Sequence, residues 1–222
     1  MNSSKELFSA VAVIALLFLC GASVVSGTKR FHVKCTDNLK HLRQAAQQYE
    51  NDHKGIIVPV LMPVKNRAVF WSERILPYLG SRMEIFYCPQ DERRGAKMLD
   101  VPDLLPIGYS VNAVSYGMNY YIGDVGRSRK SQKTSDYHVS RITDPSRLIY
   151  FGDAKSLRLR PTRMCWDRDY APRHKNGSYF VFADGHTEWL NHKTLGLLDQ
   201  LNGDPRWERD PGRWLLGKKN KR

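Results

Sequence analysis

Three side chains in the C-terminal third of the sequence have the chemistry of metal ligands. His174 is followed by Asp184 and His186, and Asp153 precedes them as a further oxygen donor. Imidazole nitrogen and carboxylate oxygen both bind Zn²⁺, but a zinc site needs three or four ligands at a fixed reach. Alternatively, His174 reaches back toward Asp184 and forms a structural hydrogen bond. We favour the structural role, so the sequence predicts no metal and no cofactor, with His174, Asp184 and His186 as the metal candidates.

The familiar catalytic signatures do not occur in the sequence. It contains no nucleophile elbow, no phosphate-binding loop, no His-Glu-x-x-His zinc motif and no dinucleotide fingerprint. We therefore expect a protein that is not an enzyme. No small-molecule substrate is evident from the sequence.

Four cysteines lie at positions 20, 35, 88 and 165, and none belongs to a CxxC or CxxH pair. Their spacing therefore does not indicate a metal site. Cys20 falls within an apolar run, where we expect a membrane-buried thiol. If the rest of the chain lies outside the cytoplasm, one disulfide can form among Cys35, Cys88 and Cys165, with one thiol left over. The sequence leaves the choice of pair open.

The elements that must position these side chains begin with an apolar N-terminal run. Leu7 to Val25 contains 19 residues without a charge. As a helix this run spans about 28 Å, close to the hydrocarbon thickness of a bilayer. Val25-Ser26-Gly27 also fits a signal-peptide cleavage point, but the run exceeds the roughly 7 to 15 residues usual in such peptides. We favour a retained anchor over residues 1–28, with most of the chain outside the cytoplasm, although Lys29 and Arg30 argue for the opposite orientation.

A second helical pattern follows over residues 29–55. Apolar residues recur there at three- and four-residue steps, namely Leu39, Leu42, Ala46 and Tyr49. The pattern stops at His53-Lys54-Gly55, where cations and a glycine suit a helix C-terminus. The sequence therefore predicts an amphipathic helical spine whose apolar side packs against the remainder of the chain.

Residues 56–201 have the composition of a globular α+β head, and residues 202–222 form a basic tail. Hydrophobic patterns in the head predict an edge strand over 56–63, a helix over 69–79, a strand over 85–89, short strands in 107–122, a buried strand over 147–151 and a helix over 192–201. The clearest signal covers residues 178–190. There Asp184-Gly185 separates two alternating runs and predicts a hairpin with a two-residue type I′ turn.

The chain carries a formal net charge of +13 and has a pI near 9.7. Such a balance favours acidic partners, namely nucleic acid, anionic glycans or phospholipid surfaces. Basic residues cluster at 127–133, at 155–168 and in the tail. The sequence therefore supports an alternative function, a membrane-tethered extracytoplasmic binder of polyanions such as DNA or an acidic polysaccharide.

Five short motifs occur in a fixed order between residues 35 and 190. They are Cys35-Thr36-Asp37-Asn38-Leu39-Lys40-His41-Leu42 with Tyr49 and Asp52, Phe86-Tyr87-Cys88-Pro89-Gln90-Asp91, Tyr116-Gly117-Met118-Asn119, Pro145-Ser146 before an apolar strand, and His174 separated by nine residues from Asp184-Gly185. Together they resemble the H-X9-DG family of bacterial prepilin-like proteins, also described as type II secretion system protein G-like. Each motif alone has low specificity, and the resemblance depends on their shared order.

The resemblance implies a pilin-like α+β fold, in which a long N-terminal helix is half embedded in the membrane and a head with a small antiparallel β-sheet packs on its outer half. It implies a non-enzymatic, pseudopilin-like structural protein associated with type II secretion or pilus assembly. Such a protein is a single-pass bacterial inner-membrane protein with its head in the periplasm or outside, and it forms homo- or hetero-oligomers through its helical spines. The family motif residues here are His174, Asp184 and Gly185, and no catalytic residue is implied.

The N-terminus departs from the pilin pattern. Glu6 precedes the apolar run as a pilin glutamate would, but residues 2–5 are Asn-Ser-Ser-Lys and lack a glycine-ended leader. We therefore expect an unprocessed helix that anchors the protein.

Overall fold

The structure is a computed structural model that describes residues 33–64, 67–95, 114–123, 138–160 and 169–191. The chain divides into two compact units, Met1–Lys34 and Cys35–Arg222, and the architecture below is that of the second. The predicted anchor over residues 1–28, the helix over 192–201 and the tail over 202–222 lie outside the described residues. In the part of the chain that is described, no helix has both the length and the apolar character to cross a membrane.

A helix over residues 33–52 is the longest element of the described structure. Its inward face is buried, and the residues on it are Cys35, Asn38, Leu39, Leu42, Arg43, Ala45, Ala46, Tyr49 and Glu50. Its other face exposes polar side chains such as Lys40, Gln44 and Gln47. The predicted burial of Leu39, Leu42 and Tyr49 is therefore confirmed, because the three- and four-residue spacing places them on one side of the helix.

The helix ends where the sequence predicts. Lys54 and Gly55 both have positive φ angles, 55° and 80°, and the Gly55 N–H donates to the Glu50 carbonyl at 2.7 Å. Such left-handed residues satisfy the last carbonyls of a helix and turn the chain away from its axis. His138 lies beside this end and its Nε2 is 2.9 Å from the Lys54 carbonyl oxygen.

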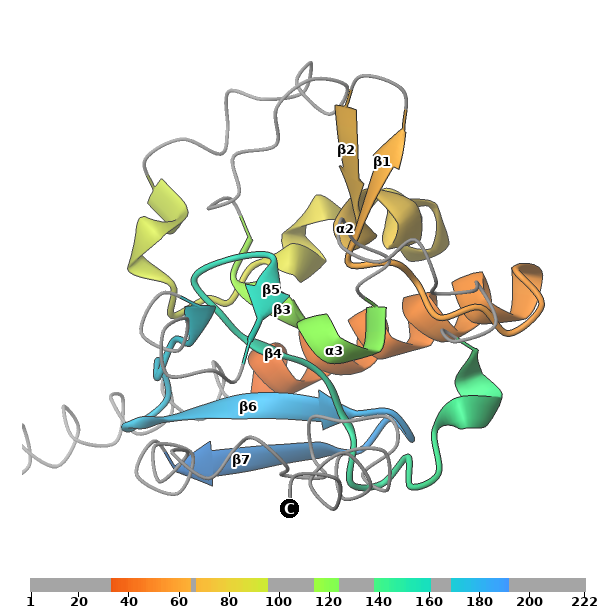
Figure 1. Cartoon of the computed structure of the whole chain (residues 1–222). Coiled ribbons are helices and arrows are strands. Elements are labelled where there is room, and N and C mark those ends of the chain that lie inside the picture. Colours follow the sequence, from red (N-terminus) through yellow and green to blue (C-terminus); the bar gives the residue numbers. More distant parts are fainter. Residues whose placement is uncertain (1–32, 65–66, 96–113, 124–137, 161–168, 192–222) are drawn as a thin grey trace, which may run out of the picture. The chain divides into compact units, whose positions relative to one another are not determined.

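A mixed sheet of five strands packs against the helix in the described region (Figure 1), in the order β5-β3-β4-β6-β7. The strands are β3 (Tyr116–Asn119), β4 (Ile149–Asp153), β5 (Arg158–Leu159), β6 (Gly177–Phe182) and β7 (Thr187–Asn191). The β3–β4, β4–β6 and β6–β7 pairs are antiparallel, but β3 and β5 run parallel. The head therefore has a mixed α/β fold, and the expectation of a purely antiparallel sheet is wrong at β5.

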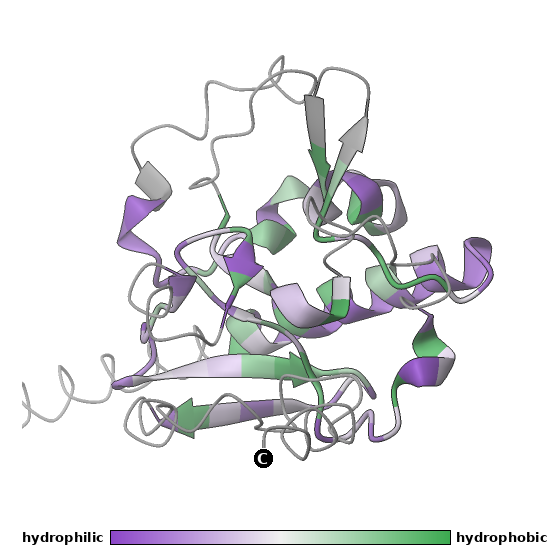
Figure 2. Ribbon diagram, viewed as in Figure 1, coloured by the Kyte–Doolittle hydropathy of each residue, from purple (hydrophilic) through white to green (hydrophobic). Residues whose placement is uncertain are grey.

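Side chains of β6 alternate between two apolar clusters on opposite faces of the sheet, while in β4 the register shifts between Ile149 and Phe151 and both Tyr150 and Phe151 join the larger cluster. Tyr150 and Val181 belong to the larger cluster, which includes the inward face of the helix. Ile149 and Phe180 belong to a smaller cluster with Tyr170 and other residues. Figure 2 shows hydrophilic colour along much of the helix and hydrophobic colour along the C-terminal half of β6. The two central strands are thus buried from both sides.

Shorter elements occupy the chain between the helix and β3. They are β1 (Leu61–Val64), β2 (Arg67–Phe70), α2 (Trp71–Ile75) and the 3₁₀ helices η1 (Leu76–Leu79), η2 (Met83–Phe86) and η3 (Glu92–Gly95). β1 and β2 form a two-stranded antiparallel sheet. The Trp71 indole from α2 packs against Phe86 and Phe151 at centroid distances of 5.8 and 4.7 Å. This aromatic contact joins the helical segment to the central strand β4.

Two predictions for this region need correction. The helix predicted over 69–79 begins only at Trp71, because Phe70 still belongs to β2, and from Leu76 it continues as the 3₁₀ helix η1 with Pro77 in its first turn. The strand predicted over 85–89 is wrong, because Ile85 and Phe86 lie in η2 and residues 87–89 are not assigned to a strand. The apolar residues of this segment are buried in the core, as the apolar run predicts, but a 3₁₀ helix buries them as well as a strand would.

Two further elements complete the described chain. They are α3 (Tyr120–Gly123), which follows β3 directly, and the 3₁₀ helix η5 (Val139–Arg141). The buried strand predicted over 147–151 is confirmed as β4, with its start two residues later and its end two residues later.

The hairpin predicted over 178–190 is confirmed as β6 and β7, but its turn differs. Gly185 has a φ of 96°, whereas Asp184 is not among the described residues with positive φ. The Gly185 N–H donates to the Phe182 carbonyl and the Phe182 N–H donates to the His186 carbonyl, each at 2.9 Å. This pattern is a three-residue loop in which a turn is followed by a left-handed glycine, so the predicted two-residue type I′ turn is wrong.

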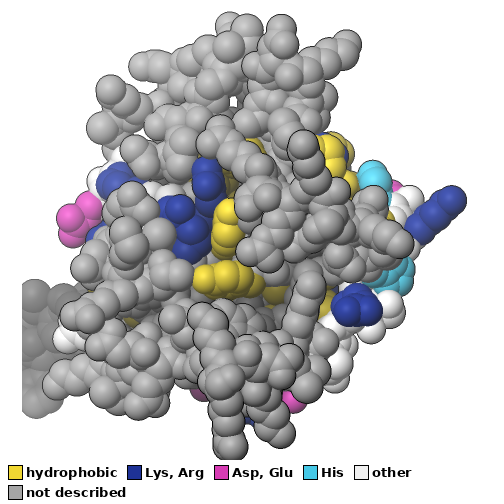
Figure 3. All heavy atoms as spheres, viewed as in Figure 1, with side chains coloured by type: hydrophobic (Ala, Val, Ile, Leu, Met, Phe, Trp, Pro, Cys, Tyr) yellow, Lys and Arg dark blue, Asp and Glu magenta, His cyan; other side chains and the backbone are white. Residues whose placement is uncertain are grey.

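Some cationic side chains of the described surface lie close to apolar ones. On the face shown in Figure 3, Lys and Arg side chains gather beside a strip of hydrophobic side chains. Several arginines of the described part pair with acids, namely Arg43 with Glu50, Arg93 and Arg173 with Asp91, and Arg160 with Asp169. Part of the basic charge is therefore neutralised by ion pairs within the head.

We predict that a charge at Leu42 unfolds the head. Leu42 is fully buried on the inward face of the helix, and Leu42→Asp leaves a carboxylate there without a partner, at a cost of more than about 4 kcal/mol. Limited proteolysis and urea unfolding measure the effect. The matched control is Gln44→Asp, on the exposed face of the same helix, and equal stability of the two variants would contradict the packing.

Candidate functional site: a buried cluster of thiols, histidine and carboxylate

Four residues from four separate segments meet inside the head and form the thiol cluster, which consists of Cys35, Cys88, Asp153 and His174. All four side chains are fully buried. The two Sγ atoms lie 2.9 Å apart, and Cys88 Sγ lies 3.4 Å from His174 Nε2. The same Nε2 atom is 3.3 Å from Asp153 Oδ2. The cluster thus joins the first described turn of the helix, the segment after η2, the end of β4 and the turn before β6.

A tight turn before β6 sets the direction of His174. Lys175 and Asn176 have φ angles of 50° and 60°, as the two central residues of a type I′ turn require. The backbone N–H groups of His174 and Gly177 each donate to the other residue's carbonyl at 3.0 Å. A Cβ at Gly177 would lie 2.5 Å from the Trp189 ring, and the indole N–H of Trp189 donates to the His174 carbonyl at 2.8 Å. Backbone geometry and β7 therefore hold His174 in place.

Asn38 holds the two cysteine-bearing segments together. Its side-chain amide donates to the Tyr87 carbonyl at 3.0 Å and to the hydroxyl oxygen of Tyr116 at 3.3 Å. Asn38 lies one helical turn after Cys35, and Tyr87 directly precedes Cys88. A buried amide with both partners present fixes the helix, the Tyr87–Cys88 segment and β3 relative to one another. This contact keeps the two thiols adjacent.

Charges in the thiol cluster favour an ionised pair. Burial lowers the pKa of His174, but hydrogen bonds to Asp153 and Cys88 outweigh this effect and raise the pKa to about 9. The hydrogen bond from Cys35 lowers the pKa of Cys88 to about 6, against burial and with the help of His174. The pKa of Cys35 is raised by its hydrogen bond to Cys88 and by burial. An imidazolium, a Cys88 thiolate and a neutral Cys35 thiol are therefore the favoured forms.

The geometry does not match a catalytic triad. In a triad the nucleophile and the carboxylate contact different ring nitrogens of the histidine, whereas Cys88 and Asp153 both lie nearest Nε2 of His174. Cys88 is also fully buried and has no exposed surface to offer a substrate. The cluster can do two other things, which are to hold a thiophilic metal ion or to form a disulfide.

Three atoms of the cluster have the proximity of metal ligands. Sγ of Cys35, Sγ of Cys88 and a ring nitrogen of His174 lie within 4.8 Å of one another, and Asp153 adds a carboxylate beside His174. Thiolate and imidazole are the ligands that Zn²⁺ prefers in structural sites. His174 and Asp153, both considered as ligands from the sequence, are therefore brought together here.

The other metal candidates lie elsewhere. Asp184 Oδ1 is 2.7 Å from Nδ1 of His186 and accepts the His186 backbone N–H at 3.1 Å. The His186 ring stacks on Phe182 with centroids 4.3 Å apart. These contacts stabilise the turn between β6 and β7, while His174 contacts Cys88 and Asp153. The residues of the expected His174–Asp184 pair thus have separate partners at opposite ends of β6.

The sequence named Cys35 and Cys88 as possible disulfide partners but did not associate them with His174 and Asp153. Cys35 and Cys88 are 53 residues apart, and Cys88 and His174 are 86 residues apart, so no local spacing links them. The available signal was that both cysteines stand in motifs of the suspected family. No protein-family model matches the chain, and neither a curated protein nor a solved structure matches it.

A second buried network ties the helix to the β6–β7 turn. Arg43 Nη1 contacts Glu50 Oε2 at 3.1 Å, and its Nε donates to the Ala183 carbonyl at 2.8 Å. The Tyr150 hydroxyl donates to Glu50 Oε1 at 2.6 Å, and the Arg43 guanidinium lies 4.6 Å from the Tyr150 ring centroid. Burial raises the pKa of Glu50, although Arg43 and Tyr150 oppose the shift.

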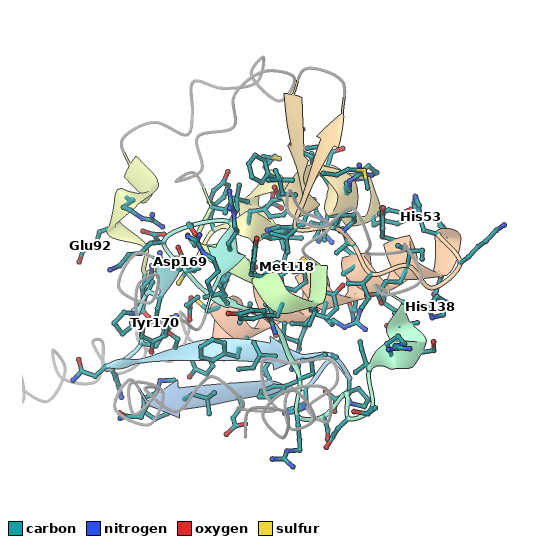
Figure 4. The ribbon with its side chains drawn as sticks, in the orientation of Figure 1. His53, Glu92, Met118, His138, Asp169 and Tyr170 are labelled. Atoms are coloured by element: carbon teal, nitrogen blue, oxygen red, sulfur yellow. The ribbon has the colours of Figure 1, made fainter. Side chains whose placement is uncertain are left out.

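Asp91 is the centre of an ion-pair network on another side of the head. Its carboxylate accepts from Arg93 Nη2 and from the Ser115 hydroxyl, each at 2.7 Å, and it lies 2.8 Å from Arg173. Figure 4 labels Glu92, Asp169 and Tyr170 on this side. Because Arg173 directly precedes His174, Asp91 helps to position the segment that carries the histidine of the thiol cluster.

We predict that Asp91 supports stability only above acidic pH. Burial raises the pKa of this carboxyl, but Arg93, Arg173 and Ser115 outweigh burial and lower the pKa from 3.8 to about 2. Because the folded pKa lies below the unfolded one, its stabilisation of roughly 2 kcal/mol is present above pH 3.8 and is lost as the pH falls toward 2. The urea midpoints of the wild type and Asp91→Asn should therefore converge between pH 4 and 2. A constant gap would contradict the assignment.

We predict that His174 and His186 contribute very differently to stability. His174→Ala leaves the buried Asp153 carboxylate without its imidazole partner, and we expect a loss of roughly 3 to 5 kcal/mol. His186→Ala removes a side chain that is 43% exposed, and we expect a loss below about 1 kcal/mol. Urea unfolding at pH 7 measures both values. Equal losses would show that the buried contacts of His174 contribute no more to the free energy of unfolding than the exposed contact of His186.

Proposed function

We propose that the chain is a pseudopilin-like, membrane-anchored structural protein of the bacterial inner membrane, associated with type II secretion or pilus assembly and without enzymatic activity. The observation that carries this proposal is the packing of a mixed α/β head on one face of the helix over residues 33–52. This helix follows the uncharged run Leu7 to Val25 in the sequence. An apolar run followed in the sequence by a helix on which a head is docked is the plan expected of a pilin-like protein.

Contacts among the five motifs support the proposed family. Asn38 of the first motif binds the backbone of the second at Tyr87 and the side chain of the third at Tyr116. The Asp184 N–H of the last motif donates to the Pro145 carbonyl of the fourth at 3.2 Å. Motifs that are far apart in the sequence are thus adjacent in the fold. A shared structural task explains why they would occur together.

The exposed face of the helix limits how copies of the protein associate. Lys40, Gln44, Gln47 and Gln48 are exposed and polar, so this face offers little apolar area to another spine. Lateral packing between spines is therefore assigned to the apolar run, where close helix–helix contact does not require polar desolvation. In this proposal homo- or hetero-oligomers form within the membrane, and the heads project into the periplasm or beyond.

Polyanion binding receives less support from the described residues. Of the basic segments 127–133, 155–168 and the tail, only residues 155–160 are described. Arg160 there binds Asp169 through two nitrogens at 2.6 and 2.9 Å. A guanidinium engaged in this way is less available to phosphate or sulfate groups. We therefore retain the pseudopilin-like function as the proposal.

We predict that the full-length protein, expressed in a bacterial host, is found intact in the inner-membrane fraction with its head digestible only from the periplasmic side. The variant Leu16→Arg/Leu17→Arg should leave the membrane fraction, because each central arginine costs about 2.5 to 3.5 kcal/mol on insertion. Gln44→Arg/Gln47→Arg adds the same charge on an exposed face and should stay membrane-bound. A soluble periplasmic product beginning near Thr28 would overturn the anchor.

A further inference from the structure

We propose that Cys35 and Cys88 are joined by a disulfide that fixes the first described turn of the helix to the head. Both cysteines are present as free thiols in the structure, and both are buried. Their sulfur atoms are 2.9 Å apart, closer than two unbonded sulfurs normally approach, while a disulfide bond measures about 2.05 Å. The thiol cluster is thus a site of cysteine oxidation. A disulfide explains the short distance between its two sulfurs, which a metal site would otherwise have to explain.

The alternative occupant is Zn²⁺, and the charge balance of the cluster disfavours it. Two thiolates on a tetrahedral zinc would stand about 3.8 Å apart, so the sulfurs would have to separate. A zinc bound by both thiolates and by Asp153 would also carry a net negative charge in a site where all four side chains are fully buried. A disulfide removes both thiol protons and leaves two neutral sulfurs, which an apolar interior accommodates.

Surrounding contacts prepare the two thiols for bond formation. Asn38 binds the Tyr87 carbonyl at 3.0 Å, so the backbones that carry Cys35 and Cys88 are already held side by side. His174 lies 3.4 Å from Cys88 Sγ and covers the sulfur from the side of β6. Asp153 in turn holds the imidazole at 3.3 Å. As the head completes its folding, these contacts bring the two sulfurs within bonding reach of each other.

The reaction is a thiol–disulfide exchange with an oxidant that carries a disulfide, either a small molecule or an oxidoreductase. The Cys88 thiolate attacks one sulfur of that disulfide, and a mixed disulfide forms as the first oxidant thiolate leaves. Cys35 then loses its proton to water and its thiolate attacks Cys88 Sγ, which releases the second oxidant thiolate. Two thiols are oxidised, one disulfide is reduced, and the proton count balances.

Burial determines when this exchange occurs and how the bond behaves afterwards. Cys35 and Cys88 have no exposed surface in the folded head, so the mixed disulfide must form while the head is still folding. Once formed, the bond is shielded from thiol reductants because attack requires access to a sulfur. The bond closes a loop with 53 residues of sequence separation, and restraining a long loop stabilises the folded state.

The inference rests on the proposed extracytoplasmic location only for the supply of oxidant in the cell, and the decisive experiment avoids this dependence. The full chain is refolded in detergent in a defined mixture of reduced and oxidised glutathione, alkylated and digested with trypsin. The four cysteines fall on separate tryptic peptides, namely 6–29, 35–40, 83–93 and 164–168. Mass spectrometry therefore identifies any linked pair without ambiguity.

We expect a linked peptide that joins 35–40 to 83–93, which disappears on reduction after denaturation but persists when glutathione is added to the folded protein. A link from either peptide to 164–168 or 6–29 would overturn the proposal. So would four free thiols after refolding, and free Cys35 and Cys88 thiols with one equivalent of bound zinc would identify the cluster as a metal site. Failure of the protein to reach the membrane in cells would count only against the proposed function.

A second measurement protects the test against variants that fold poorly. The thermal midpoint of the refolded wild type should fall by roughly 10 °C when the bond is reduced in denaturant and the thiols are kept reduced during refolding. Cys35→Ser and Cys88→Ser should show no such dependence on reductant, and Cys165→Ser should behave as the wild type. A wild-type thermal midpoint that is the same for the oxidised and the reduced protein would exclude a stabilising disulfide.

Discussion

A buried arginine–glutamate pair on the inward face of the helix constrains where the strands of the head can lie. Arg43 and Glu50 stand two turns apart on that face, and both are almost fully buried. Leaving either charge unpaired in the interior costs several kcal/mol, so the head must bring polar groups to both. It does so with the Ala183 carbonyl and the Tyr150 hydroxyl. β4 and the turn after β6 are therefore tied to specific positions along the helix.

Both ends of β6 are tied to this arrangement, which gives a physical meaning to the nine residues between His174 and Asp184. The interval holds the turn at Lys175 and Asn176, the six residues of β6, and Ala183. One end places His174 in the thiol cluster, and the other presents the Ala183 carbonyl to Arg43. A strand one residue longer or shorter would reverse which face its side chains occupy or would displace one of these contacts.

Local patterns in the sequence predicted what local physics determines. The spacing of Leu39, Leu42 and Tyr49 predicted the buried face of the helix, and alternation around Asp184-Gly185 predicted the β6–β7 hairpin. The turn type was missed because the Asp184 carboxylate accepts the His186 N–H at 3.1 Å, a side-chain contact that residue preference alone does not reveal. The apolar residues near Ile85 suited a strand equally well, and tertiary packing selected a 3₁₀ helix.

The thiol cluster lay beyond sequence reasoning for a different reason. Its members come from residues 35, 88, 153 and 174, and only the completed fold brings them together. The aspartate and histidine were suspected, but their expected partner was Asp184, because proximity in a hairpin was the only geometric guide. Contacts between distant segments depend on how elements pack, and the sequence pattern of each element specifies only its own buried face.

The helix is held by the head at two separate places, and this has a mechanical consequence. Cys35 and Asn38 contact the segment after η2, while Arg43 and Glu50 contact the turn after β6 and the strand β4. Cys35 and Glu50 are about 22 Å apart along the helix axis at 1.5 Å per residue. Attachment at one point would let the head rock about the helix, whereas attachment at two points makes helix and head move as one body. In the proposed pseudopilin-like function, this stiffness would make the position of the head follow that of a membrane-anchored spine.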